Sequence, residues 1–154
     1  MKINSVTLKG TYDFIHRDKT GRIIDQFSVD NTITSAAKAA LALLIQGNAT
    51  TKYTRIAIGS SATAAVVGNT TLAAEITSPS LARALSTATR VTTTVTNDTS
   101  NLVHTYSSTA TQTVKEAGVF DSASGGTLLS RVTFTAKNLS SGDTLQVTHK
   151  CKVA

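Results

Sequence analysis

Hydrophobic and polar residues alternate along both ends of the chain, with a period of two residues. Near the N-terminus, one face of the pattern carries Val6, Leu8, Gly10, Tyr12 and Phe14. The same period returns in residues 128–134 and in residues 144–153. Because successive side chains of a β-strand point to opposite faces, this alternation predicts strands with one face in a core.

Turn residues divide these patterns into hairpins. The cluster Asp18–Gly21 separates the first strand from a second one at Ile23–Val29, which predicts an N-terminal hairpin within residues 1–30. Further strands are expected at Arg55–Gly59, Arg90–Thr96, Leu102–Ala110, Thr113–Phe120, Leu128–Thr135 and Thr144–Val153. This series predicts a mainly β protein, an antiparallel β-sandwich or jelly-roll-like barrel that forms a single domain over residues 1–154.

One segment has the period of a helix instead. Residues 35–46 follow a candidate N-cap at Thr34 or Ser35 and end before Gly47. Apolar residues recur at helical spacing, at Ala37, Ala40, Leu41, Leu44 and Ile45. We therefore expect the helix to pack on the sheet, in one core made of Leu41, Leu44, Ile45, Val132, Phe134, Leu145 and Val147.

Two stretches lack a clear period. Asn48–Lys52 is expected to be a polar loop, and residues 60–89 form a long excursion rich in alanine, threonine and serine, with a helical turn expected at Thr71–Ile76. Loops of this length are usually functional or disordered. We expect a neighbouring subunit to order the excursion, and the candidate protein–protein contact residues are Val66, Val67, Leu72, Ile76, Leu81 and Leu85.

Composition limits the kind of partner. The chain has 154 residues, 15 Lys and Arg against 9 Asp and Glu, a net charge of +6 and a single cysteine. The basic residues are scattered singly, which favours a solvated face or contact with an acidic protein surface over nucleic-acid binding. One cysteine excludes an intrachain disulfide, and Cys151 is expected to be a free, buried thiol. No stretch approaches the ~18 apolar residues of a membrane span, so no membrane partner is expected.

Candidate chemistry is sparse. The histidines His16, His104 and His149 fall in separate strands without a second metal ligand beside them. No nucleophile, phosphate-loop or paired-carboxylate motif is present, so we expect neither an enzyme nor a cofactor or metal site. Glu116 lies in an otherwise apolar strand, where an isolated carboxylate is costly. Either it faces solvent, or it forms a structural ion pair with Arg131 or Arg90.

Three consecutive motifs support a family resemblance. They are Val-Lys-Glu-Ala-Gly-Val-Phe-Asp at 114–121, Gly-Gly-Thr-Leu-Leu-Ser-Arg-Val-Thr-Phe at 125–134, and Ser-Gly-Asp-Thr-Leu-Gln-Val at 141–147. The series resembles a module of bacteriophage structural proteins, and the segments 55–59 and 72–75 are also similar to that group. The N-terminal hairpin lies outside the resemblance.

The resemblance implies a structural role in a phage particle. Small capsid-associated proteins and tail, collar and fibre proteins carry similar modules, and the short chain without repeats favours a capsid decoration, or cement, protein. The implied partners are the major capsid protein or other virion proteins, and copies of the chain itself, with a trimer favoured. The implied location is the virion, assembled in the cytoplasm of a bacterial host. The alternative is a tail, collar or fibre module involved in host attachment.

Overall fold

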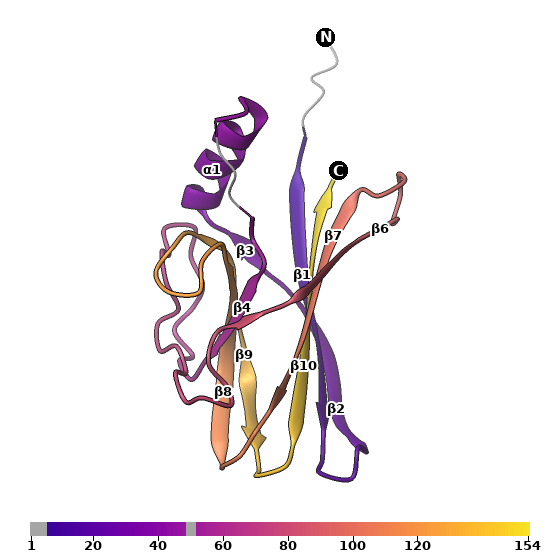
Figure 1. The fold of residues 1–154 in the computed structure, drawn as a ribbon, viewed down its shortest axis with the longest axis vertical. Coiled ribbons are helices and arrows are strands. Elements are labelled where there is room, and N and C mark those ends of the chain that lie inside the picture. Colours follow the sequence, from indigo (N-terminus) through magenta and orange to yellow (C-terminus); the bar gives the residue numbers. More distant parts are fainter. Residues whose placement is uncertain (1–5, 49–51) are drawn as a thin grey trace.

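Two antiparallel sheets of five strands each pack face to face in the computed structural model, which describes residues 6–48 and 52–154 (Figure 1). Sheet A has the order β2 (Ile23–Asp30), β1 (Leu8–Arg17), β10 (Thr144–Val153), β7 (Thr99–Ser107) and β6 (Thr87–Val91). Sheet B has the order β3 (Thr32–Ile33), β9 (Leu128–Leu139), β8 (Gln112–Phe120), β4 (Arg55–Gly59) and β5 (Ala84–Leu85). The predicted mainly β class is confirmed, as a β-sandwich. Residues 1–5 of the predicted hairpin and 49–51 of the predicted polar loop lie outside the described residues.

The core lies between the two sheets, where the alternation predicts it. On β1, Tyr12 and Phe14 are fully buried, and Phe14 pairs with the buried Val147 of β10. Leu145 and Val132 are also buried, as expected. Phe134 is only partly buried, although it packs against this core. Aromatic rings fill the end of the core near it, with the Phe14 centroid 4.5 Å from that of Phe134 and 4.7 Å from that of Phe27.

The helix α1 (Ser35–Ile45) forms where it is predicted, but it packs differently. Thr34 is the N-cap, and its side chain accepts a hydrogen bond from the Ala37 N–H. Ala37 is the one buried residue of the helix, while Leu44 is 45% and Ile45 88% exposed. The prediction that Leu44 and Ile45 belong to the core is therefore wrong, and Leu41 is only half-buried. The reason is geometric, because α1 starts at the end of sheet B and extends beyond the sandwich (Figure 1).

The cap residue fixes the start of this helix to sheet B. Besides accepting from Ala37, the Thr34 hydroxyl donates to the Leu128 carbonyl. We expect Thr34→Ala to lower the free energy of unfolding by about 1 to 2 kcal/mol, the upper part of the range for a lost cap. Urea denaturation measures this, with Ser35→Ala, at the exposed first helical residue, as the matched control. Equal stability of the two variants would contradict the assignment of Thr34 as the N-cap that joins α1 to sheet B.

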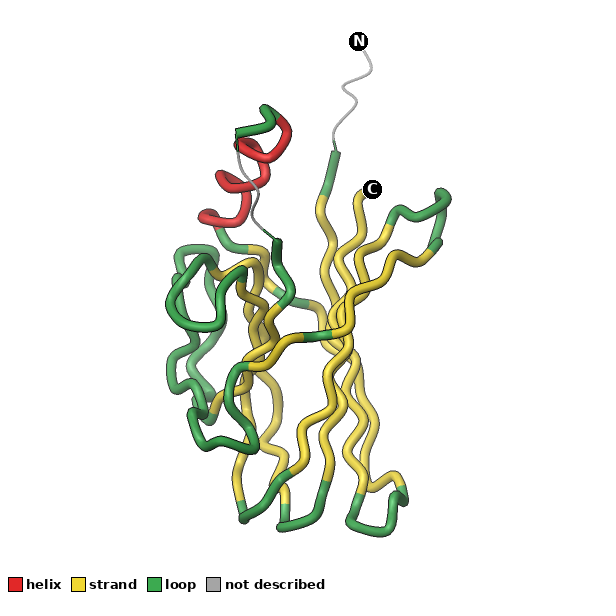
Figure 2. Tube along the Cα trace, in the orientation of Figure 1, coloured by secondary structure: helices red, strands yellow, loops and turns green. Residues whose placement is uncertain are grey.

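Residues 60–83, here named the covering loop, lie on the outer face of sheet B (Figure 2). Leu72 packs there against Ala57, Phe120 and Leu128 in a second, smaller cluster. Strands β4 and β8 are consequently buried on both faces over most of their length. The stretch is largely irregular, as expected, but the helical turn expected at Thr71–Ile76 is absent and an isolated bridge joins Gly59 to Glu75 instead.

The strand predicted at Arg90–Thr96 is shifted towards the N-terminus. Strand β6 ends at Val91, and residues 92–98 form a turn. The Asp98 carboxylate accepts hydrogen bonds from the backbone N–H groups of Thr93, Thr94 and Val95, which hold the pKa of Asp98 well below its ordinary value. Threonine and valine favour strands, but one carboxylate that binds three successive N–H groups folds this segment back.

Cys151 lies on β10 and is 9% exposed. Burial raises the pKa of its thiol, which reduces the fraction of reactive thiolate at neutral pH. We therefore expect a thiol reagent to label the native protein much more slowly than the urea-denatured protein. Labelling at the denatured rate, or a covalent dimer on a non-reducing gel, would contradict the burial of this residue.

Candidate functional site

The predicted ion pair between Glu116 and Arg131 is present and fully inside the protein. Arg131 Nη2 and Nε lie 2.7 Å and 2.8 Å from Glu116 Oε2, and the side chains are 1% and 0% exposed. Strands β8 and β9 bring the two together, because Arg131 pairs with Gly118 and Glu116 with Thr133. Arg90, the other predicted partner, is exposed on β6 of the opposite sheet.

This pair fastens the covering loop to sheet B. Arg131 Nη2 donates to the Thr63 carbonyl at 2.8 Å, and Nη1 donates to the Ala64 carbonyl at 3.1 Å and to Asn69 Oδ1 at 3.0 Å. Glu116 accepts from the backbone N–H groups of Ala73 and Ala74. Two opposite charges thus bind the backbone at both ends of residues 63–74. Such a fully satisfied buried network specifies one arrangement of the loop.

Glycine permits the close approach of loop and sheet at two positions. A Cβ atom on Gly59 would lie 2.4 Å from Glu116 Oε1 and 2.6 Å from the Ala74 carbonyl oxygen. A Cβ on Gly118 would lie 2.8 Å from a methyl carbon of Leu72. A side chain at Gly59 would therefore displace Glu116 or the loop backbone, whereas one at Gly118 would require Leu72 and Leu128 to shift.

Arg83, the last residue of the covering loop, also forms an ion pair with a carboxylate. It pairs with both carboxylate oxygens of Glu75, with its Nε 2.9 Å from Oε1 and its Nη2 2.7 Å from Oε2. Its guanidinium lies 3.5 Å from the centre of the Phe120 ring, and it also donates to the carbonyls of Ser122 and Gly125. The turn between β8 and β9 is thereby joined to the loop.

The candidate contact residues of the excursion therefore separate into two groups. Leu72, Ile76 and Leu81 are at most 7% exposed and belong to the core of the chain itself, so they are not available to a partner in this fold. Contacts within the chain order this stretch, in place of the neighbouring subunit that the sequence analysis expects. Val66, Val67 and Leu85 are more than half exposed and remain available as contact residues.

The histidines occupy three different environments. His16 Nε2 lies 3.1 Å from Asp143 Oδ2, while His149 is fully buried with Nε2 near Asn31 and Ser130. Burial lowers the pKa of His149 to about 3. His104 lies close to the Leu85 carbonyl. Among residues 6–48 and 52–154, no group of three His, Cys, Asp or Glu side chains could hold a metal ion.

An exposed apolar surface lies between α1 and the adjacent ends of β1 and β10. A groove of about 440 Å³ there continues into a second hollow of about 360 Å³, and the two share Leu8, Leu41, Leu44 and Val153. We name this surface the α1 groove, with Val6, Leu8, Leu41, Leu44, Ile45 and Val153 as its apolar lining. Val6, Ile45 and Val153 are 78%, 88% and 51% exposed. Contiguous apolar surface of this kind is typical of binding sites.

The groove is not among the features predicted from the sequence, although the chain carries a signal for it. The run Leu41-Ala42-Leu43-Leu44-Ile45 is apolar around the whole helix, and Leu43 is 50% exposed on the side away from Leu41. A helix packed on a sheet needs only one apolar stripe. Apolar residues on all sides of the second half of α1 therefore indicate that its own sheet cannot bury all of them.

Membrane-spanning helices and similarity to known proteins were also considered for this chain. Within the described part of the chain, no helix has the length and apolar character needed to cross a membrane. Comparison of the chain with known protein families, with curated proteins and with solved structures finds no match.

Proposed function

We propose that this chain is a structural protein of a bacteriophage particle, most specifically a capsid decoration, or cement, protein. The α1 groove carries the proposal, because it is an exposed apolar surface at one end of a rigid β-sandwich. The resemblance of residues 114–147 to phage structural modules supports it. In the fold, that segment supplies Glu116 and Arg131, which hold the covering loop in place.

The mechanism is stabilisation by mass action. A protein that binds the assembled shell and not the dissociated subunits shifts the equilibrium towards the intact particle. No bond is made or broken, and no cofactor takes part. The proposed partners are the major capsid protein or other virion proteins, and further copies of the chain, with a trimer favoured since closed symmetric oligomers fit symmetric positions in a shell. Val66, Val67 and Leu85 are the candidate residues for contact between copies.

Copy number tests the proposal. Quantitative mass spectrometry of purified virions gives the amount of this chain relative to the major capsid protein. A decoration protein is expected at an amount comparable to that of the capsid protein. A ratio far below it would instead assign the chain to the tail, collar or fibre, and absence from purified virions would contradict a structural role.

A further inference from the structure

We infer that the α1 groove binds an apolar segment of a partner protein that carries carboxylates along its edge. The inference rests on the proposed function in one respect, namely that this end of the molecule is an interaction surface. It goes further by naming the chemistry of the partner. Its basis is the distribution of charge around the groove and over the rest of the chain.

The carboxylates of the chain are almost all engaged within it. Of 9 Asp and Glu residues, five form ion pairs with Lys or Arg, namely Asp13, Asp18, Asp25, Glu75 and Glu116, and Asp143 lies 3.1 Å from the Nε2 atom of His16. Two more accept backbone N–H groups, Asp98 in its turn and Asp121 from Thr127. Asp30 alone has no side-chain hydrogen bond or ion pair with the described residues. Five of the nine carboxylates are therefore balanced by a Lys or Arg of the chain itself.

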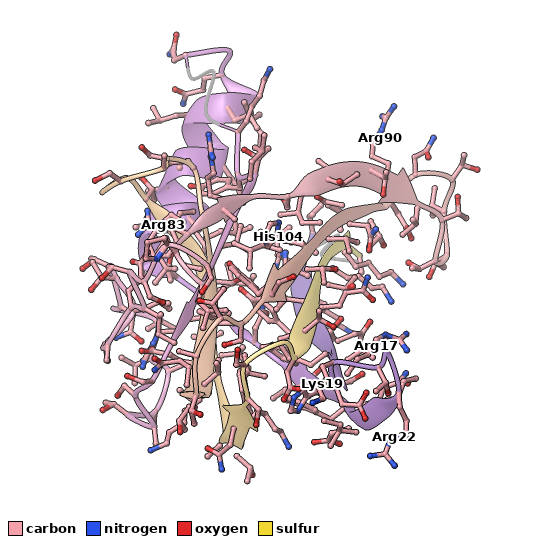
Figure 3. All side chains as sticks on the ribbon, turned by 60° about the horizontal axis from the view of Figure 1, so that its bottom comes forward. Arg17, Lys19, Arg22, Arg83, Arg90 and His104 are labelled. Atoms are coloured by element: carbon pink, nitrogen blue, oxygen red, sulfur yellow. The ribbon has the colours of Figure 1, made fainter. Side chains whose placement is uncertain are left out.

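Most Lys and Arg residues, by contrast, have no carboxylate partner among the described residues. Of 15 Lys and Arg residues, five form ion pairs, namely Arg22, Arg83, Arg131, Lys137 and Lys150. Lys2 lies outside the described residues, and the other nine have no carboxylate partner in the described part of the chain. Lys38 lines the α1 groove and Arg90 lines its continuation, and Arg90 projects outward from β6 (Figure 3).

One carboxylate lies beside these two cations. Asp98 lines the continuation of the groove, where it accepts hydrogen bonds from three backbone N–H groups. Lys38 and Arg90 together exceed this single negative charge, and the chain as a whole carries a net charge of +6. The lining therefore favours a partner with negative charge.

The same charges disfavour a second copy of the chain as the occupant. Two copies that meet through this groove would bring Lys38 and Arg90 of each towards the same residues of the other. Contact of this end with another face of a second copy would require free carboxylates there, and Asp30 is the single candidate in the described part of the chain. Juxtaposition of like charge suppresses association. A surface of a different protein that is both apolar and acidic would pack on the apolar lining of the groove and pair with Lys38 and Arg90.

The test uses the full-length protein and three fluorescent synthetic helical peptides. Each peptide has leucines along one face, and the residues flanking that face are glutamate, glutamine or lysine. Fluorescence anisotropy is expected to show binding of the glutamate peptide, weakened by added salt, with at least about tenfold weaker binding of the other two. The variant Lys38→Glu/Arg90→Glu should lose about tenfold or more in affinity for the glutamate peptide.

The matched control is Arg17→Glu/Lys19→Glu, which changes charge equally at the tip of the β1–β2 hairpin, far from Arg90 (Figure 3). It should bind the glutamate peptide like the wild type. Ile45→Ser, at an exposed position that leaves the core intact, should also lose binding. Circular dichroism verifies that all variants are folded.

Three outcomes would overturn the inference. They are equal binding of the three peptides, no binding of the glutamate peptide, or a wild-type oligomer in sedimentation that Ile45→Ser dissociates. The last would assign the groove to a second copy. None of them changes the copy number in virions, so failure here is distinguishable from failure of the proposed function.

Discussion

Replacing Arg131 by leucine is expected to lower the free energy of unfolding by about 3 to 5 kcal/mol, because it leaves the Glu116 charge buried without its cation. Glu116 is fully buried, and its remaining partners are the N–H groups of Ala73 and Ala74. The substitution also removes the donors to Thr63, Ala64 and Asn69. Denaturation in urea measures the loss, and we expect faster proteolysis within the covering loop.

The control is Arg22→Leu, which breaks an ion pair whose arginine side chain is 81% exposed. Pairs of this kind contribute at most about 1 kcal/mol. If Arg131→Leu destabilises the protein no more than Arg22→Leu does, then the buried ion pair does not hold the loop to sheet B.

The second large effect is expected from Phe14→Ala, which should also cost about 3 to 5 kcal/mol. Phe14 is fully buried between the two sheets, and its ring lies against those of Phe27, Phe134 and Tyr12. Removing it leaves a cavity that strands from both sheets would have to close. Thermal or urea denaturation measures the change.

Phe134→Ala is the informative comparison. It removes the same side chain from a position that is only partly buried, so we expect a smaller loss than for Phe14→Ala. An equal or larger loss for Phe134→Ala would show that the packing of β9 against β1 differs from that described. Val67→Ala, at an exposed position of the covering loop, should be close to neutral.

The strands could be predicted because their signal is local. Alternation in β1, β9 and β10 follows directly from one buried and one exposed face, and turn residues mark most boundaries. The buried Glu116–Arg131 pair was also accessible from sequence, since a carboxylate in an apolar strand needs a partner and the next strand supplied an arginine. The sequence pattern alone does not distinguish Arg131 from Arg90 as the partner of Glu116. The order of the strands in the two sheets decides it, because only Arg131 lies in the same sheet as Glu116.

The covering loop and the helix could not be placed by the same means. The ordering of residues 60–83 depends on charges more than 30 residues away in sequence, on Glu116 and Arg131. The direction of α1 depends on where sheet B ends. Periodicity detects that a helix has an apolar face, but it does not tell whether the chain itself covers that face. The periodicity therefore predicts that Leu44 and Ile45 belong to the core, although they line an open groove.

The positions of the covering loop and of α1 matter for function. Because the loop is held to sheet B and the helix residues are exposed, the candidate interface is the α1 groove and not the covering loop. A loop fixed by buried charges is a part of the scaffold. The α1 groove, by contrast, combines exposed apolar side chains with cations that no carboxylate of the described chain engages. An exposed apolar surface with cations beside it is suited to binding an apolar, acidic surface of another protein.

The cement function is tested most directly by the temperature at which particles release their DNA, measured by dye fluorescence on virions with and without this protein. We expect particles lacking it to release DNA at a lower temperature, and we expect the purified wild-type chain, but not Ile45→Ser, to restore the original value. Particles that lack the protein, release DNA at the wild-type temperature and fail to adsorb to cells would contradict the cement function and support the tail-module alternative.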